Sequence, residues 1–95
     1  SIDFDSLVSV SPRHAAVRRR MIQLAKKLSE DSFTKAYIIK RKVLPLKYIE
    51  SIVDFSRKTI ERHRKYILAN FVLINSDLDY LKDYIKDALQ EGEEA

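Results

Sequence analysis

The sequence predicts an all-α fold of about five helices in one compact domain that spans residues 1–95. Three observations predict it. The chain has one Gly and two Pro, too few for the turns of a β fold. Its apolar residues recur at helical spacing. At 95 residues with 45% hydrophobic composition, it is long enough for one core and short for two.

The first long helix is expected from Ser11 to Leu28. Ser as N-cap followed by Pro12 at the first helical position is a typical helix start. Before it, the apolar residues within 1–10 predict a short turn of helix packed on the body. The long helix carries one apolar stripe at intervals of three, four and seven residues. The stripe consists of Val17, Met21, Leu24, Ala25 and Leu28.

Two shorter helices follow. Asp31 or Ser32 can cap a helix that continues to about Lys42, with inward-facing positions at Phe33, Tyr37 and Ile38 or Ile39. Pro45 ends that segment and opens the next helix, because its fixed φ suits a first turn and disfavours a helical residue before it. This helix is expected over residues 46–53. Its buried stripe is Leu46, Ile49, Ile52 and Val53.

The last two expected helices differ in charge. Ser56 can cap a long helix that continues to about Ile74. An acidic helix is then predicted at about 77–89, since Ser76 is followed by acidic residues in the first turn. Its apolar stripe is Leu78, Leu81, Ile85 and Leu89.

The stretch from Leu46 to Lys65 has the spacing of a helix-turn-helix. The fourth, eighth, tenth and fifteenth positions of the unit are apolar, as the contact between two steeply crossed helices requires. The departures are His63, usually apolar, and Glu50 and Asp54, where smaller residues are common. The competing interpretation is two ordinary helices joined by a short turn. The four matching residues are Ile49, Val53, Phe55 and Ile60.

The second helix of this unit carries the charges expected of a DNA reader. Residues 56–75 have a net charge of +4 and residues 11–28 one of +6, whereas residues 76–95 carry −5. Arg pairs with guanine edges and Glu accepts from cytosine in the major groove. Alternatively, these are solvated charges with Glu61 and Lys65 as a helix-stabilising pair. The candidate DNA-binding residues are Ser56, Arg57, Lys58, Thr59, Glu61, Arg62, Arg64 and Lys65.

These residues also carry a resemblance to a known family. The run from Leu46, through DFSR, to His63 resembles region 4 of bacterial sigma-70-type factors, which reads the −35 promoter element. More closely, LPLKYIESIV, SRKTIERHRKYI and SPRHAAVRRRMIQLAKKL are similar to the C-terminal domain of sigma-I factors. The resemblance covers nearly the whole chain.

The resemblance implies promoter DNA as the ligand and core RNA polymerase as a partner of the full-length factor. It also implies regulation by the cytosolic N-terminal domain of a membrane-spanning anti-sigma protein, and a domain that is monomeric on its own. The core-binding region 2 would lie outside this fragment, whose first residue is Ser1. Lys58 and Arg62 differ from the acidic and amide residues common in housekeeping factors, so a different target sequence is expected. The carried-over recognition positions are Ser56, Arg57, Lys58, Glu61 and Arg62.

Two further surfaces are candidates. Four arginines near the first helix are expected to contact DNA phosphates, to meet an acidic partner, or simply to be solvated. These are Arg13, Arg18, Arg19 and Arg20. The apolar segment 67–74 and the acidic helix after it are expected to form a core that leaves a groove for a partner. The possible partner-binding residues are Ile67, Phe71, Ile74, Leu78 and Leu81.

Several function classes are not expected. Two His and no Cys are too few for a zinc site, so no metal and no cofactor are predicted. No Gly-rich phosphate loop or nucleophile set is present, so an enzyme is not expected. The lack of Cys favours a cytoplasmic protein. Two alternatives remain: a protein-interaction module with an incidental basic face, and a repressor-type helix-turn-helix protein that dimerises.

Overall fold

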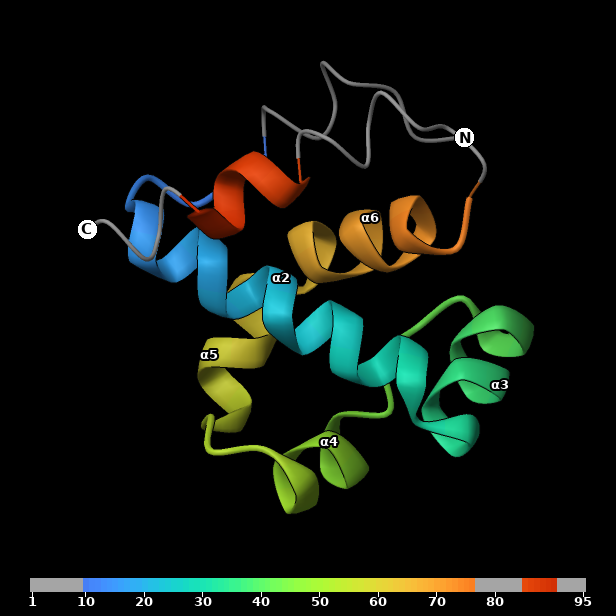
Figure 1. The fold of residues 1–95 in the computed structure, drawn as a ribbon. Helices are drawn as coiled ribbons and strands as arrows, with labels where there is room; N and C mark the ends of the chain where they lie inside the picture. Colours follow the sequence, from blue (N-terminus) through green and yellow to red (C-terminus); the bar gives the residue numbers. More distant parts are fainter. Residues whose placement is uncertain (1–9, 77–84, 91–95) are drawn as a thin grey trace.

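A computed structural model describes residues 10–76 and 85–90 of the chain, and Figure 1 shows its fold. This part of the chain contains no strand, so the all-α prediction is confirmed. None of its helices has the length and apolar character needed to span a membrane. Residues 85–90 are also helical. The labelled helices are α2 (Ala15–Glu30), α3 (Ser32–Arg41), α4 (Leu46–Ile52), α5 (Arg57–Arg62) and α6 (Arg64–Ile74).

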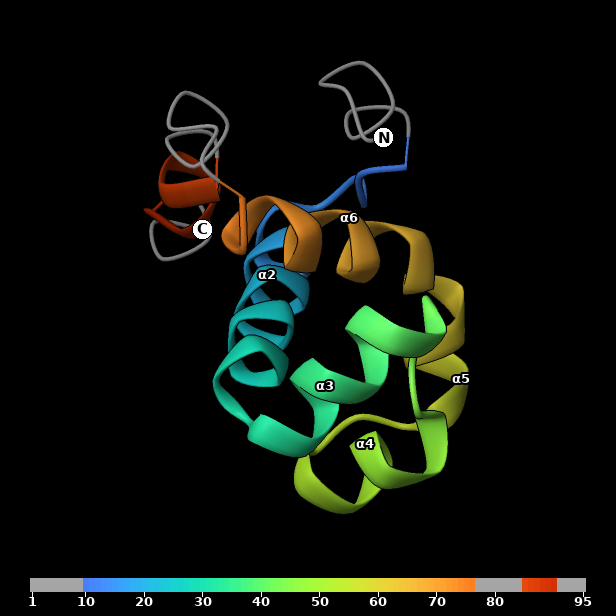
Figure 2. The same cartoon turned by 90° about the vertical axis from the view of Figure 1, so that its right-hand side faces the viewer.

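The core lies between α2 and α6, which make the largest contact between labelled helices. Helix α2 contributes the predicted apolar stripe and also Ile22, all buried except Val17, which packs at the edge. Helix α6 is buried on several sides, because Tyr66, Ile67, Phe71 and Leu73 are each at most 3% exposed. Figures 1 and 2 show α6 near the top of both views and α4 at the bottom, so α4 and α5 lie at one end of the molecule.

The predicted start of the first long helix at Ser11-Pro12 is wrong. Helix α2 begins at Ala15, and its N-cap residue His14 makes no side-chain cap. Arg18 instead donates from Nη1 to the carbonyl oxygens of Pro12 (3.0 Å) and Arg13 (2.8 Å), and Pro12 is buried. These contacts hold residues 12–14 outside the helix, so the local capping signal did not decide where the helix begins.

Helix α3 has the predicted cap but not all of the predicted inward face. The Asp31 carboxylate accepts from the Thr34 backbone N–H at 2.9 Å, which fixes the first turn. The helix packs through Thr34 and Ile38, one turn apart, and both are buried. The prediction that Phe33 faces inward is wrong, because it is 52% exposed and lies against Tyr48 with ring centroids 4.6 Å apart.

The long helix predicted from Ser56 to Ile74 is two helices. The break is at His63, whose backbone (φ −109°, ψ 17°) leaves the helical region. Figure 1 shows the axis changing direction between α5 and α6 at this point. The turn sends α6 back across α2, where its several apolar faces are buried, and leaves α5 at the end of the molecule.

Two predicted outer elements lie outside the described residues. The short helical turn within residues 1–10 falls almost entirely on residues 1–9, and the first two turns of the predicted acidic helix fall on residues 77–84. The described end of that helix does pack on the body, because Ile85 and Ala88 are buried and Leu89 lies against the core.

Candidate nucleic-acid interface

Helices α4 and α5, joined by a turn at residues 53–56, occupy the stretch predicted as a helix-turn-helix. They contact each other directly. Ile49 of α4 and Ile60 of α5 are fully buried, and Val53 and Phe55 of the turn pack against the same core. The four apolar residues singled out by spacing therefore help to join the unit to the domain, together with Leu46 and Ile52.

Ser56 determines where α5 begins. Its hydroxyl oxygen accepts from the backbone N–H of Thr59 at 3.2 Å, and the two hydroxyl oxygens are 3.0 Å apart. This cap was predicted, and it satisfies one of the free N–H groups of the first turn. Both hydroxyls thus take part in the local structure of the helix start, and Ser56 remains exposed.

The side chains of α5 that avoid the core form one charged, solvent-facing surface. Ile60 is buried beneath it, whereas the charged residues of the helix are all exposed. We call this surface the α5 face. It consists of Arg57, Lys58, Glu61 and Arg62.

An ion pair joins two members of the α5 face. Arg57 Nε lies 3.3 Å from Glu61 Oε1, with side chains 56% and 51% exposed. The alternative pairing of Glu61 with Lys65 is not the one formed. The break at His63 places Lys65 on α6, where it no longer follows Glu61 by one turn of the same helix. Arg64 and Lys65 are exposed at the start of α6, next to the α5 face rather than within it.

His63 is half-buried at the junction of the two helices. Burial lowers the pKa of its imidazole below 6.5, and the positive charge of neighbouring Arg62 lowers it further. Both effects favour the neutral form of the imidazole. The usual apolar residue at this position of the unit is thus replaced by a polar side chain whose charged form is disfavoured.

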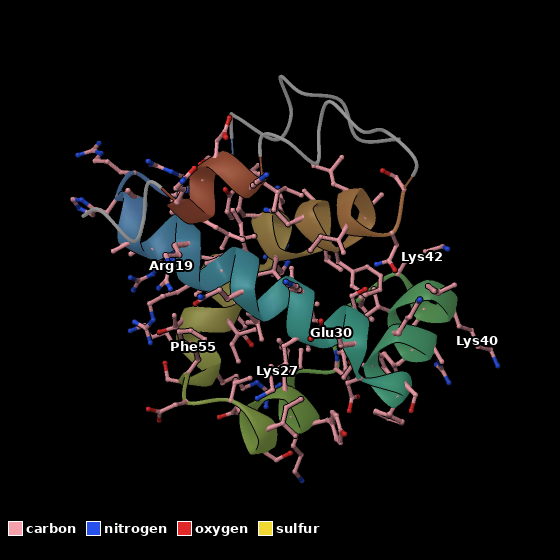
Figure 3. The ribbon with its side chains drawn as sticks, in the orientation of Figure 1. Arg19, Lys27, Glu30, Lys40, Lys42 and Phe55 are labelled. Carbon is pink, nitrogen blue, oxygen red and sulfur yellow. The ribbon has the colours of Figure 1, made fainter. Side chains whose placement is uncertain are left out.

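The four arginines near α2 have different surroundings. Arg13 is exposed, and Arg18 is used to hold the carbonyl oxygens of residues 12 and 13. Arg20 is exposed, and its guanidinium lies 4.4 Å from the centre of the Phe55 ring. Arg19 is half-buried, and Figure 3 shows it on the same edge of the molecule as Phe55. The basic end of α3, seen in Figure 3 at Lys40 and Lys42, lies on the opposite edge.

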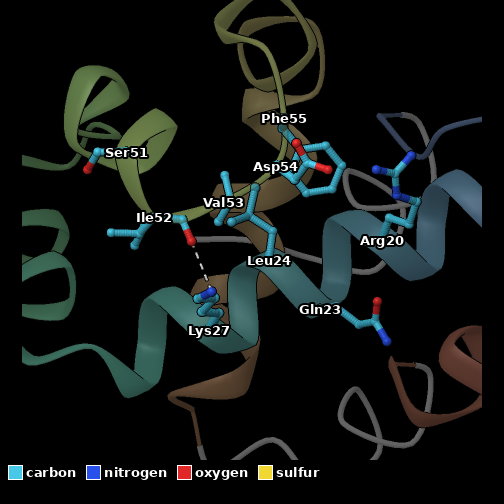
Figure 4. A pocket seen from close by; sticks show the side chains of 9 residues that line it. All are labelled: Arg20, Gln23, Leu24, Lys27, Ser51, Ile52, Val53, Asp54 and Phe55. Carbon is cyan, nitrogen blue, oxygen red and sulfur yellow. Dashed lines mark hydrogen bonds between the residues drawn. The ribbon is translucent and has the colours of Figure 1, made fainter.

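A second contact between α2 and the helix-turn-helix was missed by the sequence analysis. Lys27 Nζ donates to the carbonyl oxygen of Ile52 at 3.0 Å, as Figure 4 shows. Lys27 and Arg20 are seven residues apart, which is close to two helical turns and places them on one face of α2. The sequence could therefore show that the two cations share a face of α2, but not that this face meets Ile52. The open pocket between this face and the turn has a volume of about 600 Å³.

The predicted partner-binding residues are placed differently from the expectation. Ile67 is 0% exposed and belongs to the core, and Phe71, at 3%, is a core residue that also lines the pocket between α3 and α6. Ile74 is half-buried, and Leu78 and Leu81 lie outside the described residues. The exposed apolar side chain of α6 is instead Val72, at 47% exposure. It shares an open pocket with Ile39 of α3.

Comparisons with known proteins identify relatives that extend along nearly the whole chain. It is 43% identical over 88 residues to RNA polymerase sigma factor SigI of Bacillus subtilis (strain 168), covering 93% of this chain and 35% of that protein. It is 39% identical over 85 residues to SigI of Bacillus anthracis, covering 90% and 35%. SigI3 of Acetivibrio thermocellus is 32% identical over 91 residues, with 96% and 36% covered.

No family model matches the chain. The chain spans about a third of the length of the curated relatives it matches. The agreement nevertheless includes the helix-turn-helix and both basic segments, since 90–96% of the chain is aligned in these three comparisons. The chain is therefore a homologue of the SigI family of RNA polymerase sigma factors.

Proposed function

We propose that this chain is a promoter-reading domain that binds the −35 element in the manner of a sigma-factor C-terminal region. In this proposal α5 lies in the major groove and the α5 face meets base edges. The observation that carries the proposal is the exposure of Arg57, Lys58, Glu61 and Arg62 on a helix whose opposite side is anchored by buried Ile60. In the same proposal Ser56, Thr59, Arg64 and Lys65 would contact the flanking phosphates.

The chemistry of the α5 face supports reading of mixed G·C-containing sequence. Guanidinium groups pair bidentately with guanine O6 and N7, and a carboxylate accepts from the cytosine amino group. Three cations and one anion also give the face a net positive charge, which attracts the DNA backbone and makes binding salt-dependent. The basic residues at the start of α2 would extend this attraction along the duplex.

The proposed partners follow from the homology to sigma factors. Within a full-length factor, the domain would act together with core RNA polymerase to start transcription. We propose that a single copy of the domain binds its DNA element. The protein would be located in the cytoplasm, where the chromosome lies. The cytosolic N-terminal domain of a membrane-spanning anti-sigma protein would bind the factor and restrain it.

The test is fluorescence anisotropy of the chain with DNA that carries candidate −35 elements, against scrambled duplexes, at two salt concentrations. We expect selective binding that weakens steeply with salt. Arg62→Ala should reduce the preference for the cognate element by about 1–3 kcal/mol, the usual value of a good base contact. Lys40→Ala, an equal loss of charge on the opposite edge of the molecule, should not change that preference. Equal discrimination by wild type and Arg62→Ala would contradict the assignment.

A second candidate function is protein binding, and one observation favours it. Ile39 and Val72 are 51% and 47% exposed and line one pocket between α3 and α6, away from the α5 face. An interface there would depend little on salt, because burial of apolar area rather than ion release would drive it. Weak, non-selective DNA binding in the anisotropy experiment would favour this candidate.

A further inference from the structure

The turn of the helix-turn-helix is held to α2 at two points. Lys27 Nζ donates to the carbonyl oxygen of Ile52, the last residue of α4. The guanidinium of Arg20 lies over the Phe55 ring, in the middle of the turn, 4.4 Å from the ring centre. Figure 4 shows both side chains reaching from one face of α2 to the two ends of the segment 52–55.

Each contact satisfies a physical need of the turn. The last carbonyl groups of a helix have no partner within the helix, and a cation there also interacts favourably with the helix dipole. Phe55 is only half-buried, so one side of its ring is available to a cation, which the ring quadrupole attracts. Residue 52 ends α4 and residue 55 precedes the cap of α5, so the two contacts bracket the segment that sets the angle between the helices.

Three side chains of the segment, Ile52, Val53 and Phe55, also pack at the edge of the core, but each is only half-buried. An open pocket separates α2 from the turn, with apolar Leu24 and Val53 and polar Gln23 and Asp54 also in its lining. A turn beside open space can shift if its anchors are removed. Buried Ile49 and Ile60 join the two helices to the core, whereas Val53 and Phe55 between them are only partly enclosed by it.

We propose that Arg20 and Lys27 are positioning residues for DNA reading: they fix the orientation of α5 by clamping the turn, and they do not contact DNA phosphate. The inference rests on the proposed function. We call the two contacts of Arg20 and Lys27 the clamp. Removal of the clamp leaves the charges of the α5 face intact but allows α5 to adopt several orientations. Cognate DNA then loses more affinity than scrambled DNA, because only base contacts depend on the precise placement of the helix.

The test compares two doubly substituted chains of equal charge. Arg20→Gln with Lys27→Met removes both anchors while keeping side chains of similar length. Arg41→Gln with Lys26→Met removes the same two charges away from the turn, because Arg41 ends α3 and Lys26 lines a different pocket with Ile74 and Ile85. Both exposed pairs can be replaced without opening the core.

The first readout is the ratio of cognate to scrambled affinity across a salt series. The clamp variant should lose about five- to seventy-fold of this ratio, the factor that corresponds to losing an exposed cation–π contact and one solvent-exposed hydrogen bond. Its salt dependence should equal that of the control variant. The proposal would be overturned if affinity fell equally for all DNA sequences and the slope of log affinity against log salt were smaller than in the control by roughly 0.9 for each removed cation. That result would instead identify phosphate contacts.

The second readout needs no DNA. Amide hydrogen exchange in the free protein should become faster at residues 60–63 in the clamp variant, while α2 and α6 keep the protection seen in the control. If wild type proves non-selective, the proposed function fails, and this measurement still decides whether the clamp holds α5. Unchanged exchange at residues 60–63 would overturn the clamp whatever the DNA result.

Discussion

Replacement of Arg57 by Ala separates stability from recognition at a single side chain. In the free protein the Arg57 guanidinium contacts Glu61 at 3.3 Å, and more than half of each side chain is in water. Such a helical pair contributes about 0.3–0.5 kcal/mol. Arg57 is also the first residue of α5, where a positive charge opposes the helix dipole by about 0.3–1 kcal/mol. These effects nearly cancel, so the free energy of unfolding should change by less than about 0.5 kcal/mol.

Binding should respond very differently. A bidentate contact between arginine and guanine contributes about 1–3 kcal/mol of discrimination, which is roughly five- to 150-fold in affinity ratio. Urea unfolding followed by circular dichroism measures the first quantity, and anisotropy with duplexes changed one base pair at a time measures the second. Discrimination should fall at one position of the element and stay the same at the others.

Lys35→Ala is the matched control, because it removes one exposed cation from α3. It should leave both the unfolding free energy and the base preference unchanged. The reasoning would be refuted by an Arg57→Ala protein that loses 1.5 kcal/mol or more of stability, an amount outside the range of exposed pairs. It would equally be refuted by a variant that keeps its preference at every base pair.

Three further predictions concern the structure around the α5 face. Ile60→Ala should lower the unfolding free energy by about 2–5 kcal/mol in urea titrations, since Ile60 is 0% exposed, and a loss below 1 kcal/mol would contradict that burial. Lys42→Gly should raise it by about 0.5–1 kcal/mol, because Lys42 has φ 63°, a left-handed conformation that favours Gly, and a decrease would contradict this reasoning. The lowered pKa of His63 means that the unfolded chain takes up a proton first as pH falls below about 6.5. The contribution of His63 to the free energy of unfolding is thus complete above pH 6.5, and it is lost as the pH falls from 6.5 to the lowered pKa of the folded state. The difference in unfolding free energy between wild type and His63→Leu should therefore change with pH in this range and stay constant above pH 6.5.

Local signals in the sequence predicted the parts of the fold that local contacts determine. Asp31 and Ser56 cap α3 and α5 through hydrogen bonds to Thr34 and Thr59, three residues along the chain in each case. Such bonds depend on neighbours in sequence, so a residue type at a given spacing is enough to predict them. The apolar positions of the helix-turn-helix were found for a similar reason, because helical geometry fixes which residues share a face.

The remaining features depend on contacts between distant parts of the chain. Nothing around His63 marks the helix break, because Ile60 and Ile67 also fit one continuous helix, and the turn is determined by how α6 packs on α2. The start of α2 was misplaced because Arg18 binds carbonyl groups before the helix. The contact between Lys27 and Ile52 joins residues 25 positions apart, and no spacing rule reports such a bond without the fold.

The break at His63 also limits how much sequence information this domain can extract. Six residues of helix extend only about 9 Å at 1.5 Å per residue, which is close to three base pairs at about 3.4 Å each. Three specified base pairs occur by chance about once in 64 positions, against the millions of competing sites in a genome. On the proposed function, a promoter cannot be addressed by α5 alone. A second DNA-binding element at a fixed distance has to supply the remaining sequence specificity. The spacing between the two DNA elements then contributes to promoter recognition just as their bases do.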